Sequence, residues 1–218
     1  MEKRTRYTSP RGVFVYPKLT APDTKFKAEG EYSVKLKVAE DAPGVAALVK
    51  QIEKEAAASL AAAKEKAKTP AEAKKWETKY LPFTRVEDDE GNATGEIEFK
   101  FSMKASGVSK KTGKPWTMKP TLFDAKGKPI NGSVNIGNGT VGKVSYEIIP
   151  YSPTAQVGAS VKLALAAAQI IELRSYGEQS AKDHGFDEED GYEASDAPAQ
   201  GDFEDESESE GGESEKDF

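Results

Sequence analysis

Four stretches of the chain alternate apolar and polar residues with a period of two. They cover residues 32–38, 97–103, 144–148 and 161–165. A period of two is typical of β-strands that are buried on one face. Weaker runs lie at residues 13–15 and 116–122, and turn signals rich in Gly, Asn, Asp or Pro separate the runs. The pattern predicts a protein built mainly of short strands.

One segment follows a helical spacing instead. Residues 43–68 are rich in Ala, Leu, Lys and Glu, which favour helices, and apolar residues from Val45 to Ala56 recur on one helical face. Pro70 suits the first turn of a second, shorter helix, which we expect to run to about residue 79.

Short strands with one helical insertion are typical of a small barrel. We predict a mainly β OB-fold, a five-stranded barrel that is closed or partly open, with an α-helical insertion at about residues 43–79. A β-sandwich with a helical insertion is the alternative, because periodicity does not fix the order of strands in a sheet.

Charge is segregated along the 218 residues. Residues 183–218 contain 16 Asp and Glu against one Lys, so this segment has a net charge of −15. The first 182 residues contain 30 Lys and Arg against 21 Asp and Glu, a net charge of +9. The division predicts a body at residues 1–182 that binds a polyanion, followed by an acidic arm.

The acidic arm contains few large apolar side chains, so it cannot bury enough surface to offset its ordering entropy. We therefore expect residues 183–218 to form a disordered acidic C-terminal tail. A solubilising tail is the simplest interpretation. The last two residues, Asp217 and Phe218, suggest more, because a terminal aromatic can anchor an electrostatic contact in a partner's pocket.

Most enzyme classes lack support in the sequence. There is no phosphate-binding GxxxxGK[ST] loop, no HExxH and no GxSxG motif. The chain has no cysteine, and its one histidine, His184, lies in the polar C-terminal part, which excludes thiolate and His-rich metal sites. No stretch approaches the ~20 apolar residues that span a bilayer. We expect a cytoplasmic binding protein without cofactor, metal or membrane association.

Basic residues interleaved with aromatic residues are the strongest chemical signal. The densest group is Lys110, Lys111, Lys114 and Trp116, which combines cations for phosphates with a flat ring for bases. An ordinary basic hairpin with Trp116 packed in the core is an equally good interpretation of this group alone.

Further residues of the same kind are spread along the chain. The remaining candidate DNA-binding residues are Arg11, Tyr16, Lys18, Lys126, Lys128 and Tyr151. Alternation places Tyr16 on the same face as Phe14, so a core position competes with a role in binding. Tyr151 lies between two prolines at the end of a predicted strand, which favours exposure.

Longer strings of residues resemble one known family. Ile149-Pro150-Tyr151, the string VGASVKL at residues 157–163 and Glu172-Leu173 resemble the single-stranded-DNA-binding protein of short-tailed bacteriophages of the T-seven group. Supporting similarities are Phe99-Lys100-Phe101 and the acidic tail that ends on Asp217-Phe218.

The resemblance implies an OB-fold, a homodimer and no catalytic activity. It also implies a role in phage DNA replication, recombination and repair in the cytoplasm of the infected bacterial host. The tail would bind the phage DNA polymerase and the helicase–primase, with Phe218 essential, and would occupy the DNA-binding cleft when DNA is absent. The DNA-contacting positions of the family correspond best to Lys110 or Lys111 and to Tyr151.

These observations lead to one hypothesis and several rivals. Lysines at positions 110, 111, 114, 126 and 128 would follow the phosphates of single-stranded DNA, while Trp116, Tyr151 and Tyr16 stack on bases. The main rival is a protein-interaction adaptor barrel with a solubilising tail. A nuclease and a double-strand binder are weaker rivals, because no convincing carboxylate pair and no recognition helix are evident.

Overall fold

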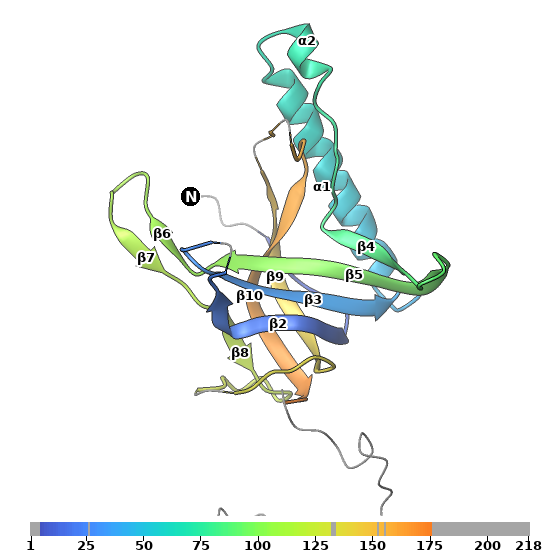
Figure 1. The fold of residues 1–218 in the computed structure, drawn as a ribbon, viewed down its shortest axis with the longest axis vertical. Helices are drawn as coiled ribbons and strands as arrows, with labels where there is room; N and C mark the ends of the chain where they lie inside the picture. Colours follow the sequence, from blue (N-terminus) through green and yellow to red (C-terminus); the bar gives the residue numbers. More distant parts are fainter. Residues whose placement is uncertain (1–4, 26, 132–133, 152, 155, 176–218) are drawn as a thin grey trace, which may run out of the picture. The chain divides into compact units, whose positions relative to one another are not determined.

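The computed structural model describes residues 5–25, 27–131, 134–151, 153–154 and 156–175 (Figure 1). Within them lie ten strands and two helices. The chain divides into two units, and all of these residues belong to the first, Met1–Glu178. The predicted tail at residues 183–218 lies outside the described residues, so the division of the chain at residue 182 stays a prediction.

Five strands pair in a ring. They are β2 (Gly12–Asp23), β3 (Glu31–Ala39), β5 (Ala93–Lys104), β9 (Val141–Pro150) and β10 (Val161–Glu172). Antiparallel pairs join β2 to β3, β3 to β5, and β9 to β10, and a parallel pair joins β5 to β10. The β5–β10 and β2–β9 seams each contain only two residue pairs, so the barrel is partly open.

This ring confirms the mainly β OB-fold and explains why the alternation was informative. All four period-two stretches lie in ring strands, and their apolar residues point into one core. The sandwich alternative is excluded because hydrogen-bonded pairs connect the five strands into a single sheet. OB-folds are barrels of this partly open, five-stranded kind.

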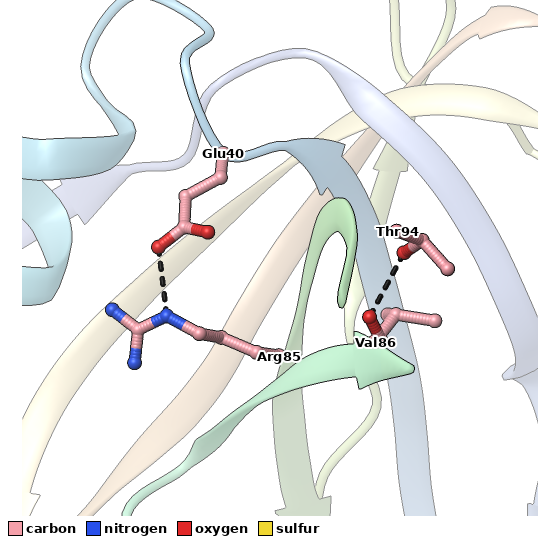
Figure 2. A network of polar contacts seen from close by, with 4 residues as sticks. All are labelled: Glu40, Arg85, Val86 and Thr94. Carbon is pink, nitrogen blue, oxygen red and sulfur yellow. Dashed lines mark hydrogen bonds and ion pairs between the residues drawn. The ribbon is translucent and has the colours of Figure 1, made fainter. Parts of the chain in front are cut away.

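Three short strands extend the ring. β1 (Arg6–Thr8) pairs with β9, β8 (Thr121–Phe123) with β10, and β4 (Phe83–Glu87) with β5. Figure 2 shows how β4 is held: Arg85 Nε donates to Glu40 Oε1 at 2.8 Å, and Thr94 Oγ1 donates to the Val86 carbonyl at 2.9 Å. The remaining strands, β6 (Ser106–Val108) and β7 (Pro115–Thr117), form a separate hairpin.

The core lies inside the ring and is built of large side chains. Phe14, Leu36, Phe99 and Phe101 are fully buried, and full burial of each stabilises the fold by roughly 1.5–3 kcal/mol. Tyr146 packs on Phe101 with ring centroids 5.1 Å apart. Burial raises the pKa of Tyr146 to about 12, because the phenolate would lose its hydration.

The helical insertion begins where it was predicted and ends differently. Helix α1 (Val45–Glu65) buries Leu48, Ile52 and Ala56 against the barrel. Helix α2 (Pro70–Ala73) begins at a cap in which Thr69 Oγ1 accepts from the Glu72 N–H at 3.2 Å. The expectation that this second helix runs to about residue 79 is wrong.

The chain does not continue the helix after α2, because residues 77 and 78 form hydrogen bonds with the connection between β9 and β10 instead. The Ala159 N–H donates to the Glu77 carbonyl at 2.9 Å, and Thr78 Oγ1 donates to the Ala159 carbonyl at 3.0 Å. Thr78 also forms a β-bridge with Gly158. The insertion is therefore fastened to the barrel at its C-terminal end as well as along α1.

Candidate nucleic-acid interface

The β6–β7 hairpin carries the densest group of basic and aromatic residues that the sequence contains. Its turn is closed by the Lys114 carbonyl, which accepts from the Ser109 N–H at 2.9 Å, while Gly113 supplies the left-handed conformation (φ +67°) that the turn requires. Lys110, Lys111 and Lys114 are exposed, and none forms an ion pair with another described residue. Three cations are thus held close together and facing solvent.

Trp116 belongs to this hairpin and not to the barrel core. Trp116 is half-buried and pairs across the hairpin with Gly107. A Cβ at Gly107 would lie 2.6 Å from Trp116 Cζ2, so the indole lies directly against the Gly107 backbone. Because glycine leaves that space free, the ring is supported by its own hairpin, beside the three lysines.

The base of the hairpin is fixed to the barrel by three hydrogen bonds. The Met118 N–H donates to the Ala105 carbonyl at 2.7 Å, and the Ala105 N–H donates to the Gly30 carbonyl at 2.9 Å. Ser106 Oγ donates to the Glu29 carbonyl at 2.8 Å. The first bond closes the base of the hairpin, and the other two join it to the turn between β2 and β3.

The outer face of β2, β3 and β5 contributes further lysines. In the pairing register, Lys18 lies opposite Ser33, and Lys35 lies opposite Lys100, so these residues share one face. Lys35 Nζ lies 2.6 Å from Glu98 Oε1, whereas Lys18 and Lys100 have no ion pair with a described residue.

OB-folds bind oligonucleotides on the face of the second and third barrel strands, here β3 and β5. Sequence reasoning did not include Lys35 and Lys100 in the site, although both stand at polar positions of the period-two stretches. The alternation places both lysines on polar faces of their strands, but the sequence does not give the strand register that makes them neighbours.

Tyr16 does not follow the alternation of its strand. The pairing of β2 with β3 is irregular between Val15 and Lys18, and Tyr16 adopts φ +48°, the one positive value among the described non-glycine residues. Its N–H donates to Asn138 Oδ1 at 2.6 Å. As a result, Tyr16 is 67% exposed while Phe14 is fully buried, so the expected shared face is wrong.

The other predicted site residues lie elsewhere on the barrel. Lys126 and Lys128 donate their backbone N–H groups to Asp124 Oδ1, in a turn whose carbonyls accept from the Gln169 side chain. Tyr151, in contrast, donates its N–H to the Ser160 carbonyl at 3.2 Å.

Gln169 and Ser160 are nine residues apart along β10, a span of about 30 Å, so the structure does not bring Tyr151 together with Lys126 and Lys128. Arg11 forms an ion pair with Glu172, the last residue of β10.

The described residues form no cluster of metal-binding side chains that would support catalysis. Among them, no three His, Asp or Glu side chains are placed to hold a metal ion. In the same part of the chain, no helix is both long enough and apolar enough to span a membrane. The fold and its exposed cations define an OB-fold protein suited to binding nucleic acid.

Comparison with known proteins narrows this class to a family. The model of the family "Single-stranded DNA-binding protein, Bacteriophage T7" matches residues 11–173. The single-stranded DNA-binding protein of Enterobacteria phage T3 is 31% identical over 197 residues, which cover 87% of this chain and 85% of the relative. The corresponding protein of Escherichia phage T7 is 39% identical over 106 residues, 48% of this chain and 45% of the relative.

Solved structures of single-stranded DNA-binding proteins are also similar to this chain. The crystal structure of gp2.5, a single-stranded DNA-binding protein encoded by bacteriophage T7, is similar at a TM-score of 0.68 and 31% identity, covering 88% of this chain and all of that chain. The single-stranded DNA-binding protein of bacteriophage Enc34, solved in complex with single-stranded DNA, has a TM-score of 0.50 at 14% identity over 79% of this chain and 88% of that one, a similarity of fold alone.

This chain belongs to the single-stranded DNA-binding protein family of bacteriophage T7. The assignment confirms the resemblance found in the sequence, and it agrees with the expectation of a binding protein and not an enzyme.

Proposed function

We propose that this protein binds single-stranded DNA without sequence preference, with the β6–β7 hairpin as its central contact. One observation carries the proposal: Lys110, Lys111 and Lys114 are exposed and unpaired among the described residues, beside a half-buried Trp116. Cations that follow the phosphates and a ring that stacks on bases are what sequence-tolerant binding requires. Lys18, Lys35 and Lys100 extend the basic surface along the outer face of the barrel.

Membership of the family supports a proposal for the biological setting. We place the protein in phage DNA replication, recombination and repair, as a homodimer in the cytoplasm of the infected bacterial host. Its partners are single-stranded DNA, the phage DNA polymerase and the phage helicase–primase. Arg11, Tyr16, Lys126, Lys128 and Tyr151 remain proposed DNA contacts.

The acidic tail is proposed to act as a switch. Residues 183–218 carry a net charge of −15 and are joined covalently to a body of net charge +9. Tethering gives the tail a high effective concentration at the basic surface, so it competes with DNA even when its intrinsic affinity is low. DNA that displaces the tail frees Asp217 and Phe218 to recruit the polymerase and the helicase–primase.

Tryptophan fluorescence tests the central contact, because the chain has only two tryptophans, Trp76 and Trp116. Oligo-dT is expected to quench the wild-type protein and the Trp76→Phe variant. Trp116→Phe should lose most of the quenching. Trp116→Ala should also weaken binding, since stacking on an aromatic contributes roughly 1–3 kcal/mol per base.

Absence of quenching in the wild type, together with binding of partners that is insensitive to salt, would support the adaptor interpretation instead. Quenching that depends on Trp76 would move the DNA away from the hairpin.

Removal of the tail tests the switch. A protein that ends at Lys182 is expected to bind oligo-dT more tightly than the full chain at low salt, and the difference should shrink as salt screens the tail.

Phe218→Ala should impair binding to the polymerase while leaving DNA affinity nearly unchanged. Fluorescence anisotropy and pull-down measure the two effects, and equal DNA affinity with and without the tail would refute competition.

A further inference from the structure

The β6–β7 hairpin exposes apolar side chains on both of its faces. Residues directly opposite each other in an antiparallel pair point to the same face, and the faces alternate along each strand. The register therefore places Trp116 and Gly107 on one face, and Val108 and Pro115 on the other. Val108 is 66% exposed, Pro115 is also exposed, and the hairpin projects from the barrel (Figure 1). The Val108 face is thus apolar but does not belong to the core.

The opposite face, which carries Trp116, continues beyond β7. The bond from the Met118 N–H to the Ala105 carbonyl extends the pairing register by one residue, so Met118 lies on the same face as Trp116. Met118 is 55% exposed, and two residues along a strand correspond to about 7 Å. The Trp116 face therefore presents an indole and a thioether to solvent, which suits the flat surface of an unpaired base.

Cations lie at the turn where the two faces meet. Lys110 and Lys111 follow β6, and Lys114 precedes β7. All three are exposed and form no ion pair with a described residue. A DNA backbone that passes around the tip from one face to the other would meet positive charge there. The turn is therefore complementary to a nucleic acid whose bases lie on both faces of the hairpin.

We infer that the hairpin recognises the junction between a duplex and a single strand, with the last base pair against Val108 and Pro115 and the first unpaired base against Trp116. The inference rests on the proposed function, because it takes Trp116 to bind single-stranded DNA, and it adds a duplex contact on a face that the proposed function does not use.

The chemistry of the Val108 face favours the end of a duplex over its grooves. Base pairs present hydrogen-bond donors and acceptors along their groove edges, which Val108 and Pro115 cannot satisfy. The flat face of a terminal base pair is largely apolar, and apolar side chains, proline among them, insert between base steps in several DNA-binding proteins. An apolar contact with the last base pair is therefore the better match.

The hairpin can hold two parts of a DNA molecule apart because its base is fixed. The Ala105 N–H donates to the Gly30 carbonyl at 2.9 Å, and Ser106 Oγ donates to the Glu29 carbonyl at 2.8 Å. Both acceptors belong to the turn between β2 and β3. A ribbon anchored in this way keeps its position when bases press on either face.

Two labelled DNA molecules test the junction contact. One is oligo-dT, and the other is the same oligo-dT joined to a duplex stem whose far end is closed by a loop. The wild-type protein should bind the tailed stem roughly ten-fold more tightly than oligo-dT, as expected for one added stacking contact. Fluorescence anisotropy at fixed salt measures both affinities, and the stem without a tail shows what the duplex contributes by itself.

Val108→Ser should remove most of this preference and leave the affinity for oligo-dT unchanged. Because no charge is lost, the salt dependence should stay the same for both DNA molecules. Val157→Ser is the matched control, since Val157 is an exposed valine outside the hairpin. Trp116→Ala should weaken binding of both DNA molecules equally, so the preference should persist. Thermal unfolding of Val108→Ser should match the wild type, because the side chain is exposed.

The two proposals fail in different ways. Absence of oligo-dT binding and of Trp116 quenching in the wild type would refute the proposed function. Normal oligo-dT binding without a preference for the tailed stem would refute the junction contact alone. A preference that survived Val108→Ser would place the duplex contact elsewhere, and an equal loss of affinity for both DNA molecules would make the Val108 face a further single-strand contact. Either result would overturn the inference.

Discussion

Simultaneous replacement of Lys110, Lys111 and Lys114 by Gln should weaken binding of single-stranded DNA on the order of 100-fold at about 50 mM salt. Each phosphate contact on a single strand contributes about 0.7 to the salt slope, so the slope should fall by about 2. The three lysines are exposed on one short turn, and their loss should not disturb the core. Anisotropy titrations of labelled oligo-dT over a range of salt measure both quantities.

The matched control removes three lysines from the helical insertion. Lys50, Lys54 and Lys64 are exposed on α1 and do not belong to the hairpin, so their replacement by Gln changes the net charge by the same amount. This variant should keep a slope close to that of the wild type. If the two triple variants lost affinity and slope equally, the hairpin would have no special role.

The substitution Gly158→Ala should cause the largest loss of stability from a single methyl group. Gly158 has φ +67°, where an alanine costs about 1–2 kcal/mol, and its Cβ would lie 2.1 Å from the Glu77 carbonyl oxygen. That oxygen is backbone and accepts the bond from Ala159, so it cannot move away freely. We expect a loss of roughly 3 kcal/mol and a decrease in Tm on the order of 10 °C.

Gly113→Ala separates backbone strain from the clash. Gly113 also has φ +67°, but a Cβ there meets nothing within 4 Å. Its alanine variant should therefore lose only the ~1–2 kcal/mol of the backbone conformation. Calorimetry of both variants measures the difference, and equal Tm values would show that the segment at residues 77–79 gives way to the new methyl group.

The strands of the ring were predictable because each is half-buried, which leaves a period of two in the sequence. β1 and β4 were not predicted, since Arg6–Thr8 and Phe83–Glu87 lie at edges where burial imposes a weak pattern. The end of α2 was also not predictable. Residues after Ala73 leave the helix because of Ala159, a partner some eighty residues later in the chain.

The candidate site divides in the same way. The group around Trp116 was predictable because the hairpin is local, so neighbours in sequence are neighbours in space. Tyr151 and Lys128 were assigned to one binding site on chemistry alone. The Tyr151 N–H and the turn that contains Lys128 contact residues near opposite ends of β10, about 30 Å apart along the strand. Lys35 and Lys100 were overlooked because only the pairing of β3 with β5 makes them neighbours.

The left-handed backbone conformation of Tyr16 destabilises the fold but exposes the aromatic side chain. Glycine, and to a lesser extent asparagine, adopts positive φ at lower cost than tyrosine, so the strand would fold more favourably with either residue at this position. Selection for stability alone would replace the tyrosine at this position. The bulge holds the phenol ring in solvent at a cost in stability, so we expect Tyr16 to be among the first residues replaced in a thermostabilised version of this barrel.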